Sequence, residues 1–291
     1  MFALKLDEKY LILSDLDGTL LNNHGRLDKL TINVIKTLVK QGNMFGIITG
    51  RPASSSVDIY RQLGLKGLLI NFNGASICNP TSKSFKTLNF GFNPSVLIEA
   101  IDDDFLKYAK NVIVETNKGV YAYDIPKNKK ERDGFYKKFH INIARRGIVK
   151  IQNNFKNLKD TEIFAILVQL KDINNVDWFV RLARFRLPTT ITRVWRDETY
   201  GIVVEINSRF ATKGKGLEYF SSYYGVPLSR CITFGDGDND DEMLKTSGCG
   251  FAMKNATMTA KLSAKFITKY DNDNCGVARE LINLFKLKGF N

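Results

Sequence analysis

Two aspartates follow an apolar run near the start of the chain. In the segment YLILSDLDGTLLNNHG, residues 10–25, Asp15 and Asp17 are separated by one residue and followed by Gly18 and Thr19. Residues two apart in an extended backbone lie on the same face, so the two carboxylates would be close together. Like charges at short distance raise each other's pKa unless a positive charge lies nearby. The pattern therefore predicts a cation at the end of a strand.

Two further segments could bind a phosphate group. GIITGRP, residues 46–52, places Thr49 and Gly50 after a second apolar run, where a hydroxyl and a backbone N–H can bind a phosphate oxygen. A helix-capping threonine explains this segment equally well. ATKGKG, residues 211–216, places Lys213 at the start of a helix, where the helix dipole disfavours a cation. Lys213 is either a surface lysine or a group that balances phosphate and carboxylate charges, and its spacing is not that of a nucleotide P-loop.

A fourth segment is dense in oxygen ligands. FGDGDNDDE, residues 234–242, contains six acidic or amide side chains within seven residues. A calcium-binding EF-hand loop that began at Asp236 would need Gly at its sixth position and Glu at its twelfth, which are Asp241 and Ser247 here. Because few carboxylates converge, and phosphate and water could complete an octahedron, Mg²⁺ is favoured over Ca²⁺.

The composition excludes several classes of protein. With 291 residues, 44% of them hydrophobic, the chain can build a packed core. It has only two histidines, and its four cysteines form no C-x-x-C pair, so a zinc site or a disulfide framework is not expected. The N-terminal MFALKLDEKY is too charged for a secretory signal, and no apolar run is long enough to span a membrane. We expect a cytoplasmic protein.

The net charge of +13 makes nucleic acid a partner to consider. The basic residues are nevertheless spread along the chain and interspersed with acidic ones. A solvated, lysine-rich surface is therefore favoured over a dedicated nucleic-acid face.

Short apolar runs alternate with helical patterns at both ends of the chain, which is typical of a parallel α/β sheet covered on both faces. Ligand sites in such sheets lie beyond the carboxyl ends of the strands, where Asp15, Asp17 and Thr49 are predicted. The middle of the chain, residues 84–187, is richer in mixed charge and is predicted to be an inserted second α/β unit. The core would then comprise residues 1–83 and 188–291. We expect strands at 10–14, 44–49, 67–71, 112–114, 120–123, 202–207, 231–235 and 249–252, and helices at 29–41, 54–63, 94–108, 176–184, 214–224, 240–246 and 276–287.

The segments at 15–19, 46–52, 211–216 and 234–242 follow one another in the order of four known motifs. Together they resemble the motifs of the haloacid dehalogenase-like superfamily of phosphohydrolases. The large insertion between the second and third motifs resembles the Cof-type, subclass IIB phosphatases, as do GRP at 50–52, NGA at 73–75 and AMKNA at 252–256. Lys254 is a departure, because the family usually has glycine there. The resemblance implies a Rossmann-like parallel sheet with helices on both faces and an inserted α/β cap of the C2 type that acts as a substrate lid.

The resemblance also implies roles for individual residues. Asp15 would be the nucleophile that forms an aspartyl phosphate, and Asp17 the general acid and base. Mg²⁺ would be bound by Asp15, Asp17 through its backbone carbonyl, Asp236 and, close by or through water, Asp240. Thr49, Gly50 and Lys213 would bind the phosphoryl group, and Asn239 would orient the acidic loop. Asp238 is not expected to be a ligand, and Arg51 either has a functional role or pairs with a neighbouring carboxylate.

The predicted function is hydrolysis of small phosphorylated metabolites, with sugar phosphates first and pyridoxal phosphate, flavin mononucleotide and nucleotides after them. Two alternatives stay open: a phosphomutase of the same superfamily, and a nucleic-acid-binding protein on a scaffold that has lost catalysis. The expected partner is a small metabolite and neither a membrane nor, on balance, a nucleic acid, and the protein is expected to be a monomer or a weak homo-oligomer.

Overall fold

A computed structural model of the chain describes residues 8–139, 141, 150–151, 155, 158, 161–199 and 201–290. The N-terminal segment that we predict not to be a secretory signal lies mostly outside these residues. The chain divides into two compact units: a core unit, Met1–Thr87 with Thr212–Asn291, and an inserted unit, Leu88–Ala211. Within the described residues, none of the helices combines the length and the apolar character that a membrane crossing requires.

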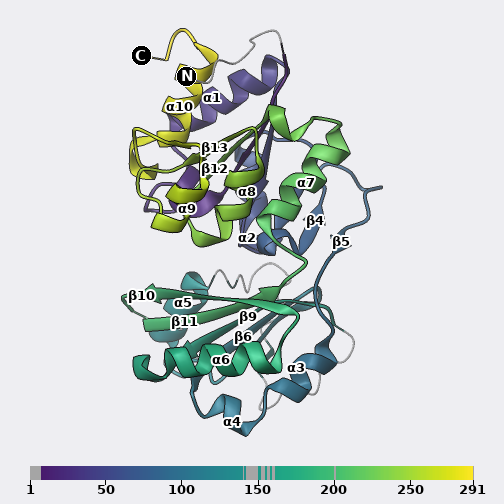
Figure 1. Cartoon of the computed structure of the whole chain (residues 1–291), viewed down its shortest axis with the longest axis vertical. Coiled ribbons are helices and arrows are strands. Elements are labelled where there is room, and N and C mark those ends of the chain that lie inside the picture. Colours follow the sequence, from purple (N-terminus) through teal and green to yellow (C-terminus); the bar gives the residue numbers. More distant parts are fainter. Residues whose placement is uncertain are drawn as a thin grey trace. The chain divides into compact units, whose positions relative to one another are not determined.

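The core unit is built on one sheet, of which β13, β12 and β4 are labelled in Figure 1. Its strands lie in the order β14-β13-β12-β1-β2-β3-β4. All neighbours from β14 to β3 are parallel, and only β4 runs antiparallel to β3. The apolar strands that the sequence predicts are therefore buried in the middle of a parallel sheet. Their bounds are β1 (Leu11–Ser14), β2 (Met44–Ile48), β3 (Leu69–Asn71), β4 (Ser76–Cys78), β12 (Cys231–Gly235), β13 (Cys249–Ala252) and β14 (Phe266–Ile267).

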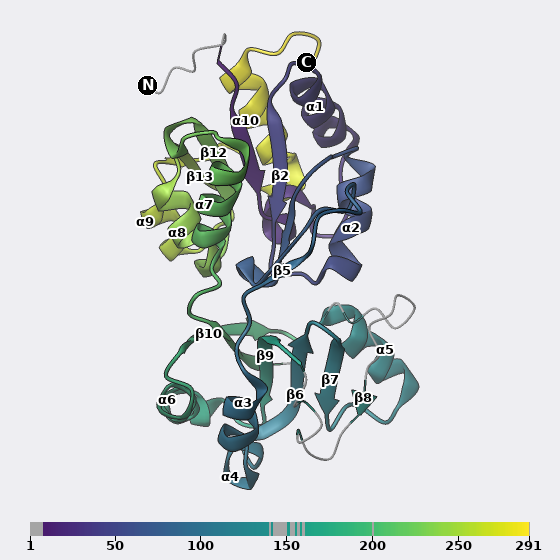
Figure 2. The ribbon, with the colours of Figure 1, turned by 90° about the vertical axis from the view of Figure 1, so that its right-hand side faces the viewer.

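Helices cover both faces of this sheet (Figure 2). On one face, α1, α2 and α10 pack their apolar stripes against strand residues such as Ile12 and Ile47. On the other, α7 approaches β2 so closely that a Cβ atom at Gly46 would lie 2.7 Å from the ring of Phe220. The predicted α/β core is thus confirmed. The helices are α1 (Lys29–Lys40), α2 (Ala53–Gln62), α7 (Lys213–Tyr224), α8 (Asp241–Thr246), α9 (Met258–Ser263) and α10 (Gly276–Phe285).

The inserted unit has its own sheet, with the order β10-β11-β9-β6-β7-β8 and antiparallel neighbours except for β7 and β8. Phe105 and Phe179, on α4 and α6, pack on one face of it, and Phe135 of α5 packs on the other. The strands of this sheet are β6 (Ala109–Thr116), β7 (Gly119–Tyr123), β8 (Lys150–Ile151), β9 (Ile163–Leu170), β10 (Thr190–Asp197) and β11 (Gly201–Ser208), and the short strand β5 (Leu88–Asn89) is not part of it. The helices are α3 (Pro94–Ala100), α4 (Asp103–Leu106), α5 (Lys129–Lys138) and α6 (Val176–Arg186).

Two sequence predictions about the inserted unit are wrong. The strand expected at 202–207 is β11, but it pairs antiparallel with β9 and β10 in the second sheet and does not belong to the core. The inserted unit consequently ends at residue 211 and not at the predicted residue 187. It begins at residue 88, close to the predicted residue 84. The apolar pattern of β11 suits a buried strand of either sheet, so only the tertiary pairing decides its partner.

The helix expected over residues 94–108 is interrupted. It consists of α3 and α4, because Asp102 begins a new helix by accepting a hydrogen bond from the backbone N–H of Phe105 at 2.9 Å. An aspartate at such a position competes with the helix backbone and favours a cap. Ala109, one residue after the predicted helix, already belongs to strand β6.

Candidate active site

The central strands of the core sheet bring the predicted residues to one edge. Asp15 follows β1, Thr49 follows β2 and Asp236 follows β12, and β1 lies between the other two strands. The chain proceeds from β1 to β3 in one direction and from β12 to β14 in the other, so the order of the sheet reverses at β1. Open α/β sheets bind their ligands at this type of switch point.

A buried lysine lies between two aspartates at this edge. Lys213 Nζ is 3.0 Å from Asp15 Oδ1 and donates a hydrogen bond of 2.7 Å to Asp240 Oδ1. Lys213 and Asp240 are fully buried and Asp15 is 7% exposed. A buried charge is tolerated only when it is paired, so each of these groups depends on the other two.

The electrostatics of the three groups follow from this burial. Desolvation raises the pKa of Asp15 well above its usual value, against the lowering effect of Lys213, and the charges of Asp240, Asp236 and Asp17 raise it further. Burial alone would lower the pKa of Lys213, but the carboxylates of Asp15 and Asp240 raise it above its usual value. The lysine is therefore a permanent cation beside a carboxylate that lacks solvent stabilisation.

Close packing places Lys213 at the site. It is the first residue of α7, and Thr212 caps this helix by accepting a hydrogen bond from the backbone N–H of Lys215 at 3.2 Å. Gly74 has a φ of 110°, and a Cβ atom there would lie 2.5 Å from the backbone oxygen of Thr212. Only glycine lets the turn after β3 come so near to the start of α7.

The acidic loop after β12 turns back on itself. Asp240 Oδ2 accepts hydrogen bonds from the backbone N–H groups of Asp236 and Gly237, at 3.0 and 2.9 Å. A Cβ atom at Gly235 would lie 2.4 Å from the Asp240 carboxyl carbon, so glycine is needed there. Both carboxylate oxygens of Asp240 are thus engaged, one by Lys213 and one by the loop backbone.

Asp236 points its carboxylate toward the turn after β1. Thr19 Oγ1 donates a hydrogen bond of 2.6 Å to Asp236 Oδ1. Desolvation and the charge of Asp240 raise the pKa of Asp236 to about 6, although the bond from Thr19 and the charge of Lys213 oppose the rise. A carboxylate so destabilised has a clear reason to bind a cation.

Carboxylate oxygens of Asp15, Asp236 and Asp240 lie within 4.8 Å of one another, a spacing that could hold a metal ion. Oxygen-only ligands suit hard cations such as Mg²⁺. Because the two oxygens of Asp240 already accept hydrogen bonds, Asp15 and Asp236 are better placed to be direct ligands. The side chain of Asp17 is not part of this group, which is consistent with the prediction that its backbone carbonyl is used.

The carboxylate of Asp17 forms its ion pair with Arg51. Arg51 Nε donates to Asp17 Oδ2 at 2.6 Å, and Nη2 donates to Oδ1 at 2.5 Å. The Asp17 side chain is 49% exposed, whereas that of Arg51 is 11% exposed. A two-bond pair of this type fixes the direction of a carboxylate. Of the two roles left open for Arg51, the structure therefore shows pairing with a neighbouring carboxylate.

Thr49, Gly50 and Asn239 meet at a residue that the sequence analysis did not assign to the site. Asn239 Nδ2 donates a hydrogen bond of 2.9 Å to Asn73 Oδ1, and a Cβ atom at Gly50 would lie 3.2 Å from the same oxygen. The backbone N–H of Asn73 donates to the backbone oxygen of Thr49 at 3.0 Å. Asn73 is buried and has a φ of 56°, a conformation that the sequence Asn-Gly after a strand could have indicated.

Two nearby residues lie apart from the carboxylate group. Asp238, which we do not expect to be a ligand, is exposed and accepts a hydrogen bond of 2.7 Å from Thr257 Oγ1. Lys254, which departs from the family pattern, is also exposed, and its backbone N–H donates to Thr268 Oγ1 at 3.0 Å.

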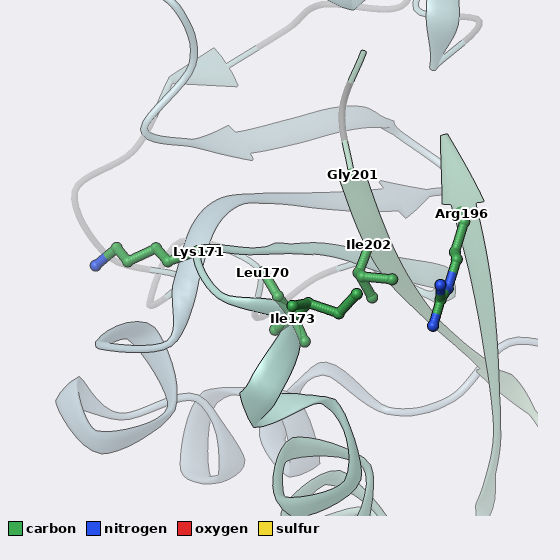
Figure 3. A pocket seen from close by; sticks show the side chains of 6 residues that line it. All are labelled: Leu170, Lys171, Ile173, Arg196, Gly201 and Ile202. Carbon is green, nitrogen blue, oxygen red and sulfur yellow. The ribbon is translucent and has the colours of Figure 1, made fainter. Parts of the chain in front are cut away.

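The inserted unit contains a pocket of a different kind (Figure 3). Leu170, Ile173 and Ile202 lie together there, Lys171 extends away from them, and Arg196 lies on the neighbouring strand. None of the predicted site residues lines this pocket. The groups suited to phosphate chemistry are therefore those at the sheet edge of the core unit.

Comparison with known proteins assigns the chain to a class. The family profile of the haloacid dehalogenase-like hydrolases matches residues 12–281. The 5-amino-6-(5-phospho-D-ribitylamino)uracil phosphatase YitU of Bacillus subtilis is 31% identical over 278 residues, which cover 96% of this chain and 98% of that protein.

Solved structures share the fold. A haloacid dehalogenase-like hydrolase from B. subtilis superposes with a TM-score of 0.76 at 24% identity and covers 94% of this chain and 99% of its own. A sugar phosphatase described as subclass IIB has a TM-score of 0.73 at 21% identity and covers 96% of this chain and 99% of its own. The chain belongs to the haloacid dehalogenase-like hydrolases. It is a phosphatase that acts on phosphorylated substrates, and these relatives favour neither the phosphomutase nor the nucleic-acid alternative.

Proposed function

We propose that this phosphatase is a Mg²⁺-dependent phosphomonoester hydrolase that works through an aspartyl phosphate and acts on phosphorylated sugars and sugar alcohols. The observation that supports it most strongly is Lys213, buried between Asp15 and Asp240 at the switch point of the sheet. A fully buried ion pair often contributes no net stability, so its presence needs another reason, and orienting a nucleophile is such a reason.

In the first step, an Asp15 carboxylate oxygen attacks phosphorus and the bond between phosphorus and the alcohol oxygen breaks. Asp17 transfers a proton to the departing oxygen, so that an alcohol leaves instead of an alkoxide. Because Arg51 donates a hydrogen bond to each oxygen of Asp17, the oxygen that carries the proton would accept its bond from Arg51 more weakly.

In the second step, water attacks the phosphorus of the aspartyl phosphate. Asp17 accepts a proton from this water, inorganic phosphate leaves, and the carboxylate of Asp15 is restored. The covalent intermediate divides one difficult displacement into two easier ones.

The phosphoryl oxygens would be bound by Lys213, the hydroxyl of Thr49 and the backbone N–H of Gly50. Lys213 would keep its contact with Asp15 and balance the charge of the phosphoryl group. Preorganised donors of this type typically contribute roughly 10² to 10³ in rate. Asn239 would hold its loop in place through Asn73, at 2.9 Å, and thereby fix the acidic side chains.

Mg²⁺ would be held by the carboxylates of Asp15 and Asp236 and the backbone carbonyl of Asp17. Asp240 would stabilise the acidic loop by accepting the backbone hydrogen bonds of Asp236 and Gly237. When bound, it would neutralise charge on the phosphoryl group. The inserted unit would act as a lid that excludes bulk water and contacts the leaving group, a role supported by its place between the second and third motifs.

The substrate proposal has two supports. The relative YitU is named for a phosphate ester of a ribityl chain, and a more distant neighbour in fold is named a sugar phosphatase. The test is phosphate release from a panel that contains 5-amino-6-(5-phospho-D-ribitylamino)uracil, hexose phosphates, pyridoxal phosphate, flavin mononucleotide and nucleotides. We expect the highest kcat/KM for a ribityl or sugar phosphate. A preference for nucleotides would overturn the substrate class, and no hydrolysis of any ester would overturn the activity.

A further inference from the structure

Two asparagines from the C-terminal part of the chain hold the turn that carries Asp15 and Asp17. This turn continues through η1 (Leu16–Leu20). Asn255 Nδ2 donates a hydrogen bond of 2.8 Å to the backbone oxygen of Gly18, and Asn272 Nδ2 donates one of 3.0 Å to that of Leu21. The turn is therefore held at its middle, Gly18, and just after its last residue, at Leu21, by side chains more than two hundred positions away.

The two asparagines also support each other. The backbone N–H of Asn272 donates to Asn255 Oδ1 at 3.2 Å, and Asn272 Nδ2 donates to Asn23 Oδ1 at 2.9 Å. The backbone N–H of Asn23 in turn donates to Asp273 Oδ1 at 2.7 Å. These hydrogen bonds connect the loop after β13, the turn η7 (Asn272–Asn274) and the end of the turn that carries Asp15 and Asp17.

The bond from Asn255 falls at the point where the turn has least room. Gly18 follows Asp17 directly and has a φ of 70°, and a Cβ atom on it would lie 2.2 Å from Asp236 Oδ2. The next residue, Thr19, is tied to Asp236 by its hydroxyl at 2.6 Å. The peptide between Gly18 and Thr19 is thus fixed by Asn255 from one direction and by Asp236 from another.

We propose that Asn255, supported by Asn272, is a positioning residue for phosphoryl transfer. It fixes the backbone on which Asp17 stands, so that the Asp17 carboxyl meets the leaving oxygen of the substrate. The inference rests on the proposed function, because it needs Asp17 as the general acid. Positioning errors near 1 Å are sufficient to reduce rates about a hundredfold, so a single well-placed hydrogen bond can matter.

The two asparagines differ in burial, and this difference decides which of them can be replaced to test positioning without disturbing the fold. Asn255 is exposed, whereas Asn272 is 5% exposed. Removing the exposed amide takes one acceptor from the backbone N–H of Asn272, so we expect the fold to stay intact and the melting temperature to fall by no more than about 5 °C. A kinetic effect of Asn255→Ala would then report on the turn.

The experiment compares two substrates that differ in their need for an acid. The probes are an alkyl phosphate that the wild type hydrolyses and p-nitrophenyl phosphate, whose leaving group departs without a proton. We expect Asn255→Ala to lower kcat/KM about tenfold for the alkyl ester and no more than about threefold for the aryl ester. Asn283→Ala, an exposed asparagine of α10, is the matched control and should change neither value.

The outcomes distinguish the two proposals. Equal losses for both esters, or no loss for either, would overturn the positioning role of Asn255. An inactive wild type would overturn the proposed function instead. Asn255→Asp keeps an acceptor for the Asn272 N–H but lacks the donor to Gly18. If Asn255→Ala does not fold, the two esters are compared with Asn255→Asp.

Discussion

Lys213 Nζ lies 3.0 Å from Asp15 Oδ1 and 2.7 Å from Asp240 Oδ1, and the lysine side chain has no exposed surface. Replacing it would leave two carboxylates buried without a positive partner, a change that costs about 3–5 kcal/mol in comparable cases. We predict that Lys213→Met abolishes phosphate release and lowers the free energy of unfolding by an amount of this order in metal-free buffer at pH 7.5.

The pH dependence checks the cause of that loss. Burial raises the pKa of Asp15 and Lys213 opposes that rise, so without the lysine this carboxyl would be protonated more readily in the folded state, and the deficit should shrink as the pH falls toward 5. Urea unfolding at both pH values measures it, with the exposed Lys215→Met as the control. A deficit that stays constant with pH would point to lost packing alone.

Asp15→Asn tests the nucleophile. Because an amide does not attack phosphorus as a carboxylate does, we predict a loss of at least about 10³-fold in kcat with the fold unchanged. Steady-state kinetics and circular dichroism of the same sample provide the measurement. Asp238→Asn, which alters an exposed carboxylate of the acidic loop, should retain most of its activity. Normal turnover in Asp15→Asn would contradict the mechanism.

Asp236→Asn tests the metal site. A ligand that binds only the folded state raises the melting temperature, so Mg²⁺ should stabilise the wild type. We predict that Asp236→Asn reduces the affinity for Mg²⁺ at least about tenfold in calorimetric titration and removes most of the thermal shift. Chelation should also abolish activity until Mg²⁺ is restored. Full activity in excess chelator would rule out the cofactor, and equal losses in Asp238→Asn would show that the effect is not specific.

Arg51→Lys tests the two-bond pair with Asp17. Lysine keeps the charge but lacks the planar pair of donors that holds the carboxylate at 2.6 and 2.5 Å. We predict a fall in kcat of about tenfold with a smaller change in KM, since the acid would be less well oriented. An increase in kcat would indicate that the pair restrains Asp17 in an inactive position.

Glu115 provides a test of stability outside the active site. It is 5% exposed, and burial, with a contribution from the charge of Glu205, raises the pKa of its carboxyl well above the usual value. The folded state then binds this proton more tightly than the unfolded chain, so stability falls as the pH rises above about 4.3, the usual pKa of the unfolded group.

Glu115→Gln removes this penalty. We predict a melting temperature about 3 °C above that of the wild type at pH 8 and equal to it near pH 4. Differential scanning calorimetry across that range measures the difference, and Glu99→Gln, at an exposed position of α3, should show none. A variant less stable than the wild type at pH 8 would mean that the ionised Glu115 has a stabilising partner.

The four motifs could be predicted because each is local. An apolar run that ends in Asp15 or Thr49 specifies a strand and its carboxyl end, and parallel strands bring such ends to one edge. Strand bounds at 231–235 and 249–252 were predicted without error for the same reason. The inserted unit was harder, because antiparallel strands such as β10 and β11 are defined by their partners and less by their own pattern.

Sequence by itself indicated the family and the residues that we propose to carry the chemistry: paired aspartates, a hydroxyl, a lysine and an acidic loop, in their order along the chain. Tertiary structure decided how they are connected. It placed Arg51 on Asp17, Asn73 on Asn239 and Asn255 on Gly18, and it assigned residues 202–207 to the second sheet. Contacts between residues up to 251 positions apart leave no local pattern, because they depend on the packing of strands and loops that only the complete fold brings together.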